Sequence, residues 1–196
     1  MMIRLNGAVM LRAAVFASLM GVGLLMAGSA NAAGPPAACA VLSEKQAVAL
    51  AGGPLGAVVK QESMPADDNG HDHTTKCGYF PKGYDVDKAD GPPERGIMIT
   101  LHAMPDSEAA KRFYEQLFSM AGRSIASVPG ARIAPASGLG EAAYVQLMTL
   151  DSNPPVQLAN VGFFKGSVMG FMRVWLKRPP GDTARDAARQ VISGLP

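Results

Sequence analysis

Ile, Ile, Leu and Ala stand at every second position along residues 97–104, which is the pattern of a β-strand with one buried face. Strands are also predicted over residues 142–150, 156–164 and 167–177. Gly166 lies between the last two segments, and glycine readily adopts the positive φ that a tight turn needs. These two segments are therefore predicted to form a β-hairpin.

Apolar residues recur at helical spacing in other parts of the chain. Ser43 and Gln46 have the spacing of a capping box at the start of a first helix, and Gly52 is expected to end it. Asp106 is the expected N-cap of a second helix, which is predicted to stop at Gly122.

Asp182 or Thr183 is expected to cap a last helix, and shorter strands are predicted at 57–64, at 77–80 and within 123–140. Consecutive strands joined by short turns pair antiparallel, and helices then cover a face of the sheet. The order of elements predicts an α+β fold, with a single antiparallel sheet of five to seven strands and two or three helices packed on it.

Residues 1–32 are predicted to be a cleaved signal peptide. Arg4 and Arg12 precede an apolar run of about fifteen residues, and Ala-Asn-Ala at 30–32 is a cleavage site of the small-x-small type. A membrane-spanning helix needs roughly 20 apolar residues, so no stable membrane anchor is expected after cleavage. The protein is therefore expected to be periplasmic or secreted.

The mature chain is predicted to have a short tether at 33–41 and a single α+β domain at 42–196. Removal of Arg4 and Arg12 from the 18 basic residues leaves 16, which equals the number of acidic residues. A neutral chain without a basic run lacks the electrostatic signature of a nucleic-acid binder. Attachment to anionic lipid through a polybasic patch is disfavoured for the same reason.

The two cysteines of the chain, Cys39 and Cys77, are predicted to form a disulfide bond, because an even number of cysteines in an exported protein favours pairing. The bond would tie the N-terminal segment to the strand at 77–80. Metal ligation by the two thiolates is the alternative interpretation. A disulfide would also remove Cys77 as a nucleophile for the nearby His73.

The polar segment 65–76 is predicted to be a loop that could bind a metal. His71 and His73 flank Asp72, so on an extended segment both imidazoles would point the same way and could share a zinc or copper ion. Residues that could complete the coordination shell are Asp67, Asp68 and His102. The alternative is a solvated loop with incidental histidines and no cofactor.

Aromatic and basic residues alternate on one side of the predicted strand at 168–177. These residues are Phe171, Arg173, Trp175 and Lys177. If this side is open to solvent, it offers a binding platform for an anionic or aromatic ligand, or for a partner protein. In the alternative interpretation, the basic stems lie along the sheet and the rings pack beneath a helix or loop.

The sequence contains none of the common catalytic motifs, such as a nucleophile elbow, a zinc-protease helix or a phosphate-binding glycine loop. The favoured function is therefore a non-enzymatic, exported binding or accessory domain for an unidentified protein or small molecule. The alternatives are a metal-binding protein that uses His71 and His73, and an unrecognised enzyme.

Two short motifs resemble small exported bacterial domains of unknown function. Cys-Ala-Val-Leu-Ser at 39–43, followed by Ala-Val-Ala-Leu-Ala-Gly at 47–52, is similar to the cysteine and capped helix with which they begin, and Cys77 matches their second cysteine. Gly-Leu-Gly-Glu-Ala-Ala-Tyr at 138–144 is similar to their Gly-Leu-Gly-acidic-x-Ala turn. Many such domains are lipidated, and this chain lacks the lipidation cysteine. The resemblance implies the fold, export and an accessory role, and no catalytic residues.

Overall fold

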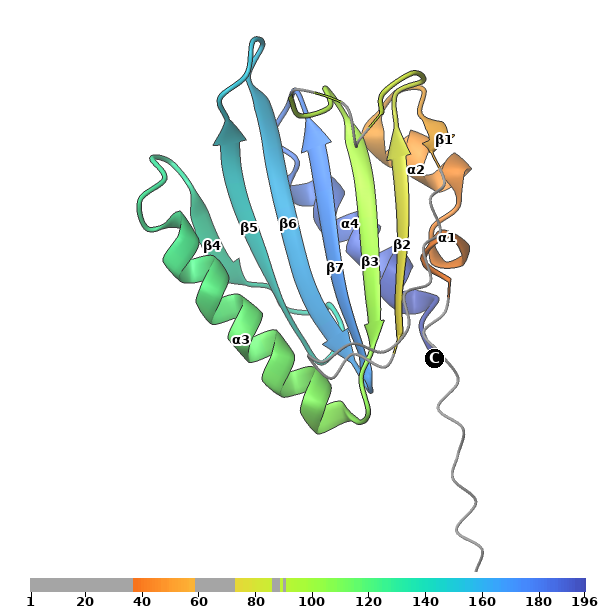
Figure 1. Ribbon diagram of the computed structural model, residues 1–196, viewed down its shortest axis with the longest axis vertical. Coiled ribbons are helices and arrows are strands. Elements are labelled where there is room, and N and C mark those ends of the chain that lie inside the picture. The colour runs from red at the N-terminus through yellow and green to blue at the C-terminus, as the bar shows by residue number, and fades with distance from the viewer. Residues whose placement is uncertain (1–36, 59–72, 86–88, 90) are drawn as a thin grey trace, which may run out of the picture. The chain divides into compact units, whose positions relative to one another are not determined.

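In the described part of the chain, seven antiparallel strands form one sheet in the order β1-β2-β3-β7-β6-β5-β4, with β7 at its centre (Figure 1). The strands are Gly56–Val58 (β1), His73–Phe80 (β2), Gly96–Ala103 (β3), Arg132–Pro135 (β4), Ala142–Leu150 (β5), Val156–Lys165 (β6) and Val168–Leu176 (β7). The computed structural model describes residues 37–58, 73–85, 89 and 91–196. The predicted signal peptide lies outside the described residues.

Helices pack on both faces of this sheet. They are Ala38–Val41 (α1), Glu44–Ala51 (α2), Ser107–Ile125 (α3) and Gly181–Ser193 (α4). Helices α1, α2 and α4 cover one face, which we call the inner face, and α3 lies on the other, the outer face (Figure 1). The predicted α+β fold with a single antiparallel sheet is confirmed. Helix α1 adds a helical turn within the segment that was predicted to be a tether.

The inner face carries the main hydrophobic core. Alternate residues of β7, such as Met172 and Val174, have no exposed area and pack against the small side chains of Ala187 and Ala188 on α4. Burial of an aliphatic side chain of the size of methionine or valine contributes roughly 1.5–3 kcal/mol relative to exposure. The side of β7 opposite to the predicted aromatic and basic platform is therefore the side that stabilises the fold.

Helix α2 begins and ends as the sequence predicts. The Ser43 hydroxyl accepts a hydrogen bond from the backbone N–H of Gln46, and the Gln46 side chain accepts one from the N–H of Ser43. Gly52 ends the helix in the left-handed conformation, with φ 68°. This capping box fixes the direction in which the chain leaves α1 and enters the inner layer.

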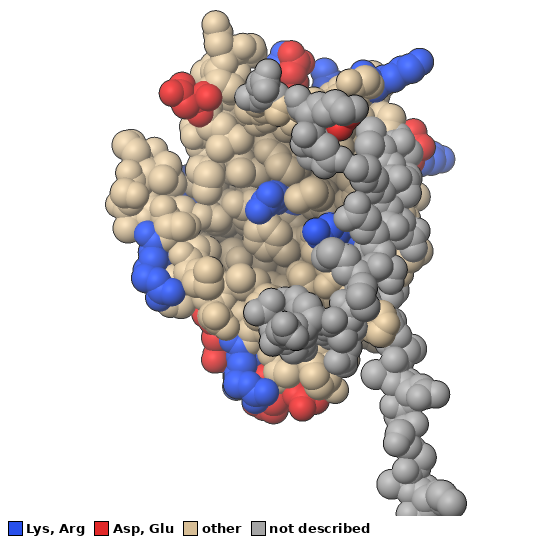
Figure 2. Space-filling view, viewed as in Figure 1, with Lys and Arg blue, Asp and Glu red and all other residues tan. Residues whose placement is uncertain are grey.

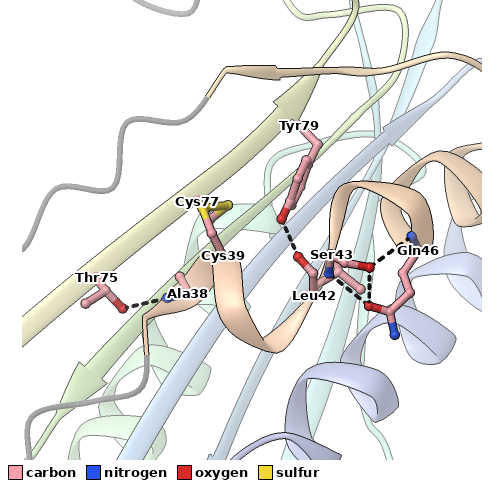
Figure 3. The surroundings of a disulfide bond; sticks show 8 residues. All are labelled: Ala38, Cys39, Leu42, Ser43, Gln46, Thr75, Cys77 and Tyr79. Atoms are coloured by element: carbon pink, nitrogen blue, oxygen red, sulfur yellow. Dashed lines mark hydrogen bonds between the residues drawn. A yellow bond between two sulfur atoms is a disulfide. The ribbon is translucent and has the colours of Figure 1, made fainter.

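A disulfide bond between Cys39 and Cys77 joins α1 to β2, as predicted, with an S–S distance of 2.07 Å (Figure 3). Beside it, the Tyr79 hydroxyl donates a hydrogen bond to the carbonyl oxygen of Leu42. Burial, with a smaller contribution from the Glu44 charge, raises the pKa of Tyr79, so the hydroxyl stays protonated and able to donate. The backbone N–H of Ala38 also donates to the Thr75 hydroxyl at 3.2 Å, so the N-terminal helices are attached to the sheet by the disulfide and by these two hydrogen bonds.

Strand β2 is longer than the predicted strand at 77–80, because it begins at His73. Thr74 and Thr75 are buried and pair with β3. Threonine is β-branched and fits a pleated, half-buried surface. The prediction of a loop over 65–76 was therefore wrong for its last four residues.

Helix α3 continues past Gly122, where it was predicted to stop, and ends at Ile125. A glycine inside a helix costs about 1 kcal/mol relative to alanine. Ile125 is only 8% exposed, and its burial offsets that cost. Of the large apolar and aromatic side chains of α3, Met120 is exposed and Tyr114 is buried.

Helix α4 begins earlier than predicted. The backbone N–H of Ala184 donates to the carbonyl oxygen of Pro180 at 2.7 Å, and no side chain of the described residues caps the helix. Asp182 and Thr183 both lie within the first turn, so the prediction that one of them is the cap was wrong. Proline is tolerated at a helix start because the first N–H groups have no acceptor within the helix.

Candidate functional site on the outer face of the sheet

Two hydrophobic clusters occupy the outer face. The first, the α3 cluster, packs α3 onto one end of the strands, and its buried members are Met104, Ala110, Tyr114, Tyr144, Phe164 and Met169. The second, the Trp175 cluster, lies toward the other end of the strands, and its buried members are Phe80, Val156, Leu158 and Trp175. A strip of the sheet separates the two clusters, and the candidate site lies in this strip.

Tyr144 anchors the α3 cluster to the sheet. Its side chain is 1% exposed, and its ring centroid lies 5.8 Å from that of Tyr114 and 5.4 Å from that of Phe118. The ring crosses the neighbouring strand above Gly162, where an added Cβ would lie 2.4 Å from it. Only glycine at this position lets the ring lie so close to the sheet.

Three polar side chains lie next to one another in the strip between the clusters. Asn160 on β6 is paired with Arg173 on β7 and with Gln146 on β5. Residues directly opposite each other in antiparallel strands project from the same face of the sheet. Arg173, Asn160 and Gln146 therefore form a polar row across the centre of the outer face.

Arg173 carries the charge of the polar row. Its side chain is exposed as a whole, and its guanidinium carbon lies 5.3 Å from the centroid of the Phe171 ring. The neighbouring side chains still remove part of the water around the guanidinium, which lowers the pKa of Arg173, while the nearby Tyr144 acts in the opposite direction. Among the described residues, Arg173 has no ion pair. A cation at the centre of a sheet face without a paired acid is suited to bind an anionic group.

The two amides of the polar row are buried and bonded to each other. Asn160 is 6% exposed and Gln146 is 4% exposed. The Nδ2 of Asn160 donates to the Oε1 of Gln146 at 2.7 Å. The Oδ1 of Asn160 has no hydrogen-bond partner among the described residues, although it is buried. A buried acceptor without a partner costs roughly 1–3 kcal/mol, so this atom is set up to receive a donor.

Partly exposed hydrophobic side chains border the polar row on both sides. Met98 lies opposite Arg173 at one end of the row, and Ile133 lies opposite Gln146 at the other end. Met148 lies beside the row with the Trp175 cluster, and Phe171 lies beside it with the α3 cluster. Figure 2 views this face, where the described surface is mostly uncharged and basic groups stand singly within it. The combination of one cation, paired amides and apolar borders is that of a site for an amphipathic molecule.

Three of the four residues of the predicted binding platform, Phe171, Arg173 and Trp175, project from the outer face, whereas Lys177 follows the end of β7 at Leu176. Phe171 is half-buried, and Trp175 is 8% exposed with its ring centroid 5.8 Å from that of Phe80. The Nζ of Lys177 lies 2.8 Å from a carboxylate oxygen of Glu94, and this contact lowers the pKa of Glu94. Of the two basic residues in this set, Arg173 is the one without an acidic partner among the described residues. The binding role of these four residues stays a prediction.

The predicted metal ligands are only partly described. His73 is exposed at the start of β2, and the Nδ1 of His102 lies 2.9 Å from the Thr74 hydroxyl. The other predicted ligands, which are His71, Asp67 and Asp68, lie outside the described residues. Within the described part of the chain, no group of three or more metal-ligating side chains is present. The zinc or copper site stays a prediction.

The amides of the polar row were not identified from the sequence. Asn160 stands in a predicted strand that is otherwise almost entirely apolar, at residues 156–164, and this was the available signal. The role of Asn160 in the polar row depends on the pairing of β6 with β7, which brings Asn160 opposite Arg173. A single strand shows which residues share its two faces, but not which residue of another strand lies opposite.

Comparisons with known proteins support the fold and do not assign a family. No family model and no curated protein matches the chain. Among solved structures, the chain is similar to the extracellular domain of PknH from Mycobacterium tuberculosis, with a TM-score of 0.51 and 9% sequence identity. The match covers 79% of this chain and 92% of that chain. At this identity the similarity concerns the fold alone. None of the helices in the described residues is both long and apolar enough to cross a membrane.

Proposed function

We propose that this chain is an exported, non-enzymatic binding domain that holds a ligand or partner on the outer face of its sheet. The observation that carries the proposal is Arg173, an exposed cation on the central strand without an acidic partner among the described residues. It stands between two hydrophobic clusters that leave the polar row uncovered by α3.

Export is supported by the disulfide between Cys39 and Cys77, because such bonds form and persist in oxidising compartments. The described cysteines include no free thiol. The structural similarity to a domain that is itself extracellular supports the same location. The N-terminal segment 1–32, with its predicted cleavage site, provides the route to that compartment.

Binding is favoured over a purely structural role for Arg173. A structural arginine is normally paired with a carboxylate, as Arg189 is with Asp186 at 2.6 Å on α4. Partial removal of water from an unpaired guanidinium is unfavourable. A ligand that brings an anionic group would compensate for this cost. A role in binding an anionic group therefore explains Arg173 better than a role in stabilising the fold.

The chemistry of the polar row favours binding over catalysis. Guanidinium and amide groups donate and accept hydrogen bonds, but near neutral pH they do not take up or release protons as a general base or acid does. Arg173 and Asn160 can thus hold and orient a polar group. Neither is a nucleophile of the kind that covalent catalysis uses.

Methionine methyl groups provide a direct test of the proposed face. Met98 and Met148 border the polar row on the outer face, whereas Met172 is fully buried on the inner face. Mature protein with 13C-labelled methionine methyl groups is mixed with a concentrated small-molecule and peptide extract of the cell envelope. We expect the NMR signals of Met98 and Met148 to shift, and that of Met172 to remain unchanged.

Two variants decide whether the shifts report binding at Arg173. Arg173→Ala is expected to abolish them. Arg189→Ala removes an arginine from α4, on the opposite side of the sheet, and should leave them intact. Shifts that persist in Arg173→Ala, or that appear at Met172 alone, would contradict the proposed function.

A further inference from the structure

The geometry points to an amphipathic hydroxy acid as the ligand, with its carboxylate on Arg173 and its hydroxyl on the Oδ1 of Asn160. This inference rests on the proposed function, because it concerns the same face of the sheet. It goes further by stating which polar groups the ligand carries and which atoms receive them.

The free acceptor of Asn160 faces away from β5. The amide nitrogen of Asn160 is committed to Gln146 on β5, at 2.7 Å. The oxygen is the other branch of the same planar group, so it lies on the side away from β5, where β7 carries Arg173. A neighbouring cation favours this orientation, because it attracts the oxygen and repels the N–H groups of the amide.

The guanidinium of Arg173 and the Oδ1 of Asn160 require opposite kinds of hydrogen-bond partner. Arg173 has donors only and needs an acceptor, preferably an anion, whereas the Oδ1 of Asn160 needs a donor. Directly opposite residues of an antiparallel pair have Cβ atoms about 5 Å apart. Both partners must therefore come from neighbouring atoms of one molecule. A carboxylate with a hydroxyl two or three bonds away meets this requirement.

The surroundings select an anion with an apolar body. Among the described strand residues that project from the outer face, Lys76 and Arg173 are basic and none is acidic. Met98 at the β3 end of the row, Met148 on one side of it and Phe171 on the other leave part of their apolar surface exposed. An alkyl chain lying along either border would bury this surface, and water would then be excluded from the polar row.

The test compares three ten-carbon probes that differ by one group each. 3-Hydroxydecanoate carries both the carboxylate and the hydroxyl. Decanoate carries the carboxylate alone, and 1,3-decanediol carries hydroxyls without a carboxylate. Binding to the mature protein is followed by calorimetry and by the fluorescence of Trp175, the single tryptophan of the chain, two residues from Arg173. We expect 3-hydroxydecanoate to bind roughly tenfold more tightly than decanoate. 3-Hydroxydecanoate should also bind at least about tenfold more tightly than 1,3-decanediol.

Variants of the polar row assign each preference to one residue. Arg173→Met should remove the advantage of the acids over the diol. Asn160→Leu should make 3-hydroxydecanoate and decanoate equal. If Asn160→Leu fails to fold because Gln146 loses its partner, the double variant Asn160→Leu/Gln146→Leu replaces both amides and keeps the test available. Matched controls are Arg189→Met on α4 and Gln157→Leu, which removes an amide from the inner side of β6.

The outcomes separate this inference from the proposed function. Equal binding of 3-hydroxydecanoate and decanoate by the wild-type protein would overturn the hydroxyl contact and leave the binding function standing. Binding of none of the probes, together with Arg173-dependent methyl shifts in the envelope extract, would overturn the ligand class alone. Binding of the probes that Arg173→Met leaves unchanged would overturn the assignment of the carboxylate.

Discussion

The two faces of the sheet are built from alternate residues of the same strands, yet they differ in what they contain. Met172 and Val174 project from the inner face of β7 into a continuous hydrophobic core under α4. Arg173, which lies between them in sequence, projects from the outer face into a polar strip between two separate clusters. One face carries a continuous hydrophobic core, and the other carries a polar strip between two separate clusters.

Under the proposed function, stability and binding belong to different sides of the sheet. On the inner face, α4 lies against the centre of the sheet and its alanines allow close approach. On the outer face, α3 covers the strand ends and leaves the centre to Arg173 and Asn160. Buried polar groups in the strip reduce the stability of that face, and the inner core with its disulfide compensates for this. Each prediction below tests this division.

The largest effect is expected from removing the disulfide, which belongs to the inner side. Cys39 and Cys77 enclose a loop with a sequence separation of 38 residues, for which the chain-entropy model gives about 4 kcal/mol. The double variant Cys39→Ala/Cys77→Ala should lose about this free energy of unfolding in urea titrations. Reduction of the wild-type protein by dithiothreitol provides an independent comparison. A loss below about 1 kcal/mol in both experiments would show that the disulfide between α1 and β2 contributes little to the free energy of unfolding.

Two methionines compare the faces directly. Met172 has no exposed area on the inner face, and Met98 is half-buried on the outer face. Met172→Ala should destabilise the protein by about 3 kcal/mol, because it leaves a cavity in a close-packed core. Met98→Ala should cost about 1 kcal/mol, because solvent already reaches its surroundings. Equal losses in urea unfolding would mean that the outer face is as tightly packed as the inner one.

High pH should weaken the α3 cluster on the outer face. Burial, followed by the charge of Tyr114, raises the pKa of Tyr144 to about 12, above its ordinary value of 10.0. The unfolded chain therefore loses this proton at a lower pH than the folded chain. The resulting stability is fully present below pH 10 and is lost as the pH rises towards 12, by about 2–3 kcal/mol in total.

The variant Tyr144→Phe isolates this contribution, because it removes the ionisable hydroxyl and keeps the ring. Between pH 9 and pH 12 the wild-type protein should lose about 2–3 kcal/mol more stability than the variant, as measured by urea unfolding at fixed pH. The other titrating groups contribute equally to both proteins. Parallel curves would contradict the inference that the Tyr144 hydroxyl is protected from water.

Features that depend on nearby residues were predicted from the sequence. The Ser43–Gln46 capping box and the hairpin around Gly166 each require only a few consecutive residues, and the structure contains both. The disulfide followed from the number of cysteines and the expected compartment. Helix ends were less predictable, because burial of Ile125 decides where α3 stops, and burial is a tertiary property.

The candidate site depends on contacts between distant parts of the chain, and this is why only part of it was predicted. Alternation along β7 placed Arg173 and Trp175 on one face correctly. Trp175 is nevertheless buried, because Phe80 from β2 packs on it. Asn160 gains its role from the strand register. Neither relation is contained in the local pattern of residues.

The smallest effect on stability, and the clearest contrast with the inner face, is expected at Arg173. Replacement by methionine keeps a long side chain over the same surface and removes the charge. The contact of the guanidinium with the Phe171 ring is lost, which costs about 0.5–1 kcal/mol. Relief from the unfavourable removal of water around the guanidinium acts in the opposite direction. Arg173→Met should therefore unfold within about 1 kcal/mol of the wild-type protein, close to Arg189→Met as the control.

This near-neutral result is what a binding residue should give, because its energy is realised only when the ligand is present. Met172, the neighbour of Arg173 on the same strand, is expected to show the reverse, with a large loss of stability and no direct effect on ligand contacts. If Arg173→Met unfolds as readily as Met172→Ala, the guanidinium supports the fold, and the outer face loses its distinction from the inner one. If stability is retained while the methionine methyl shifts disappear, the two faces differ in role as well as in composition.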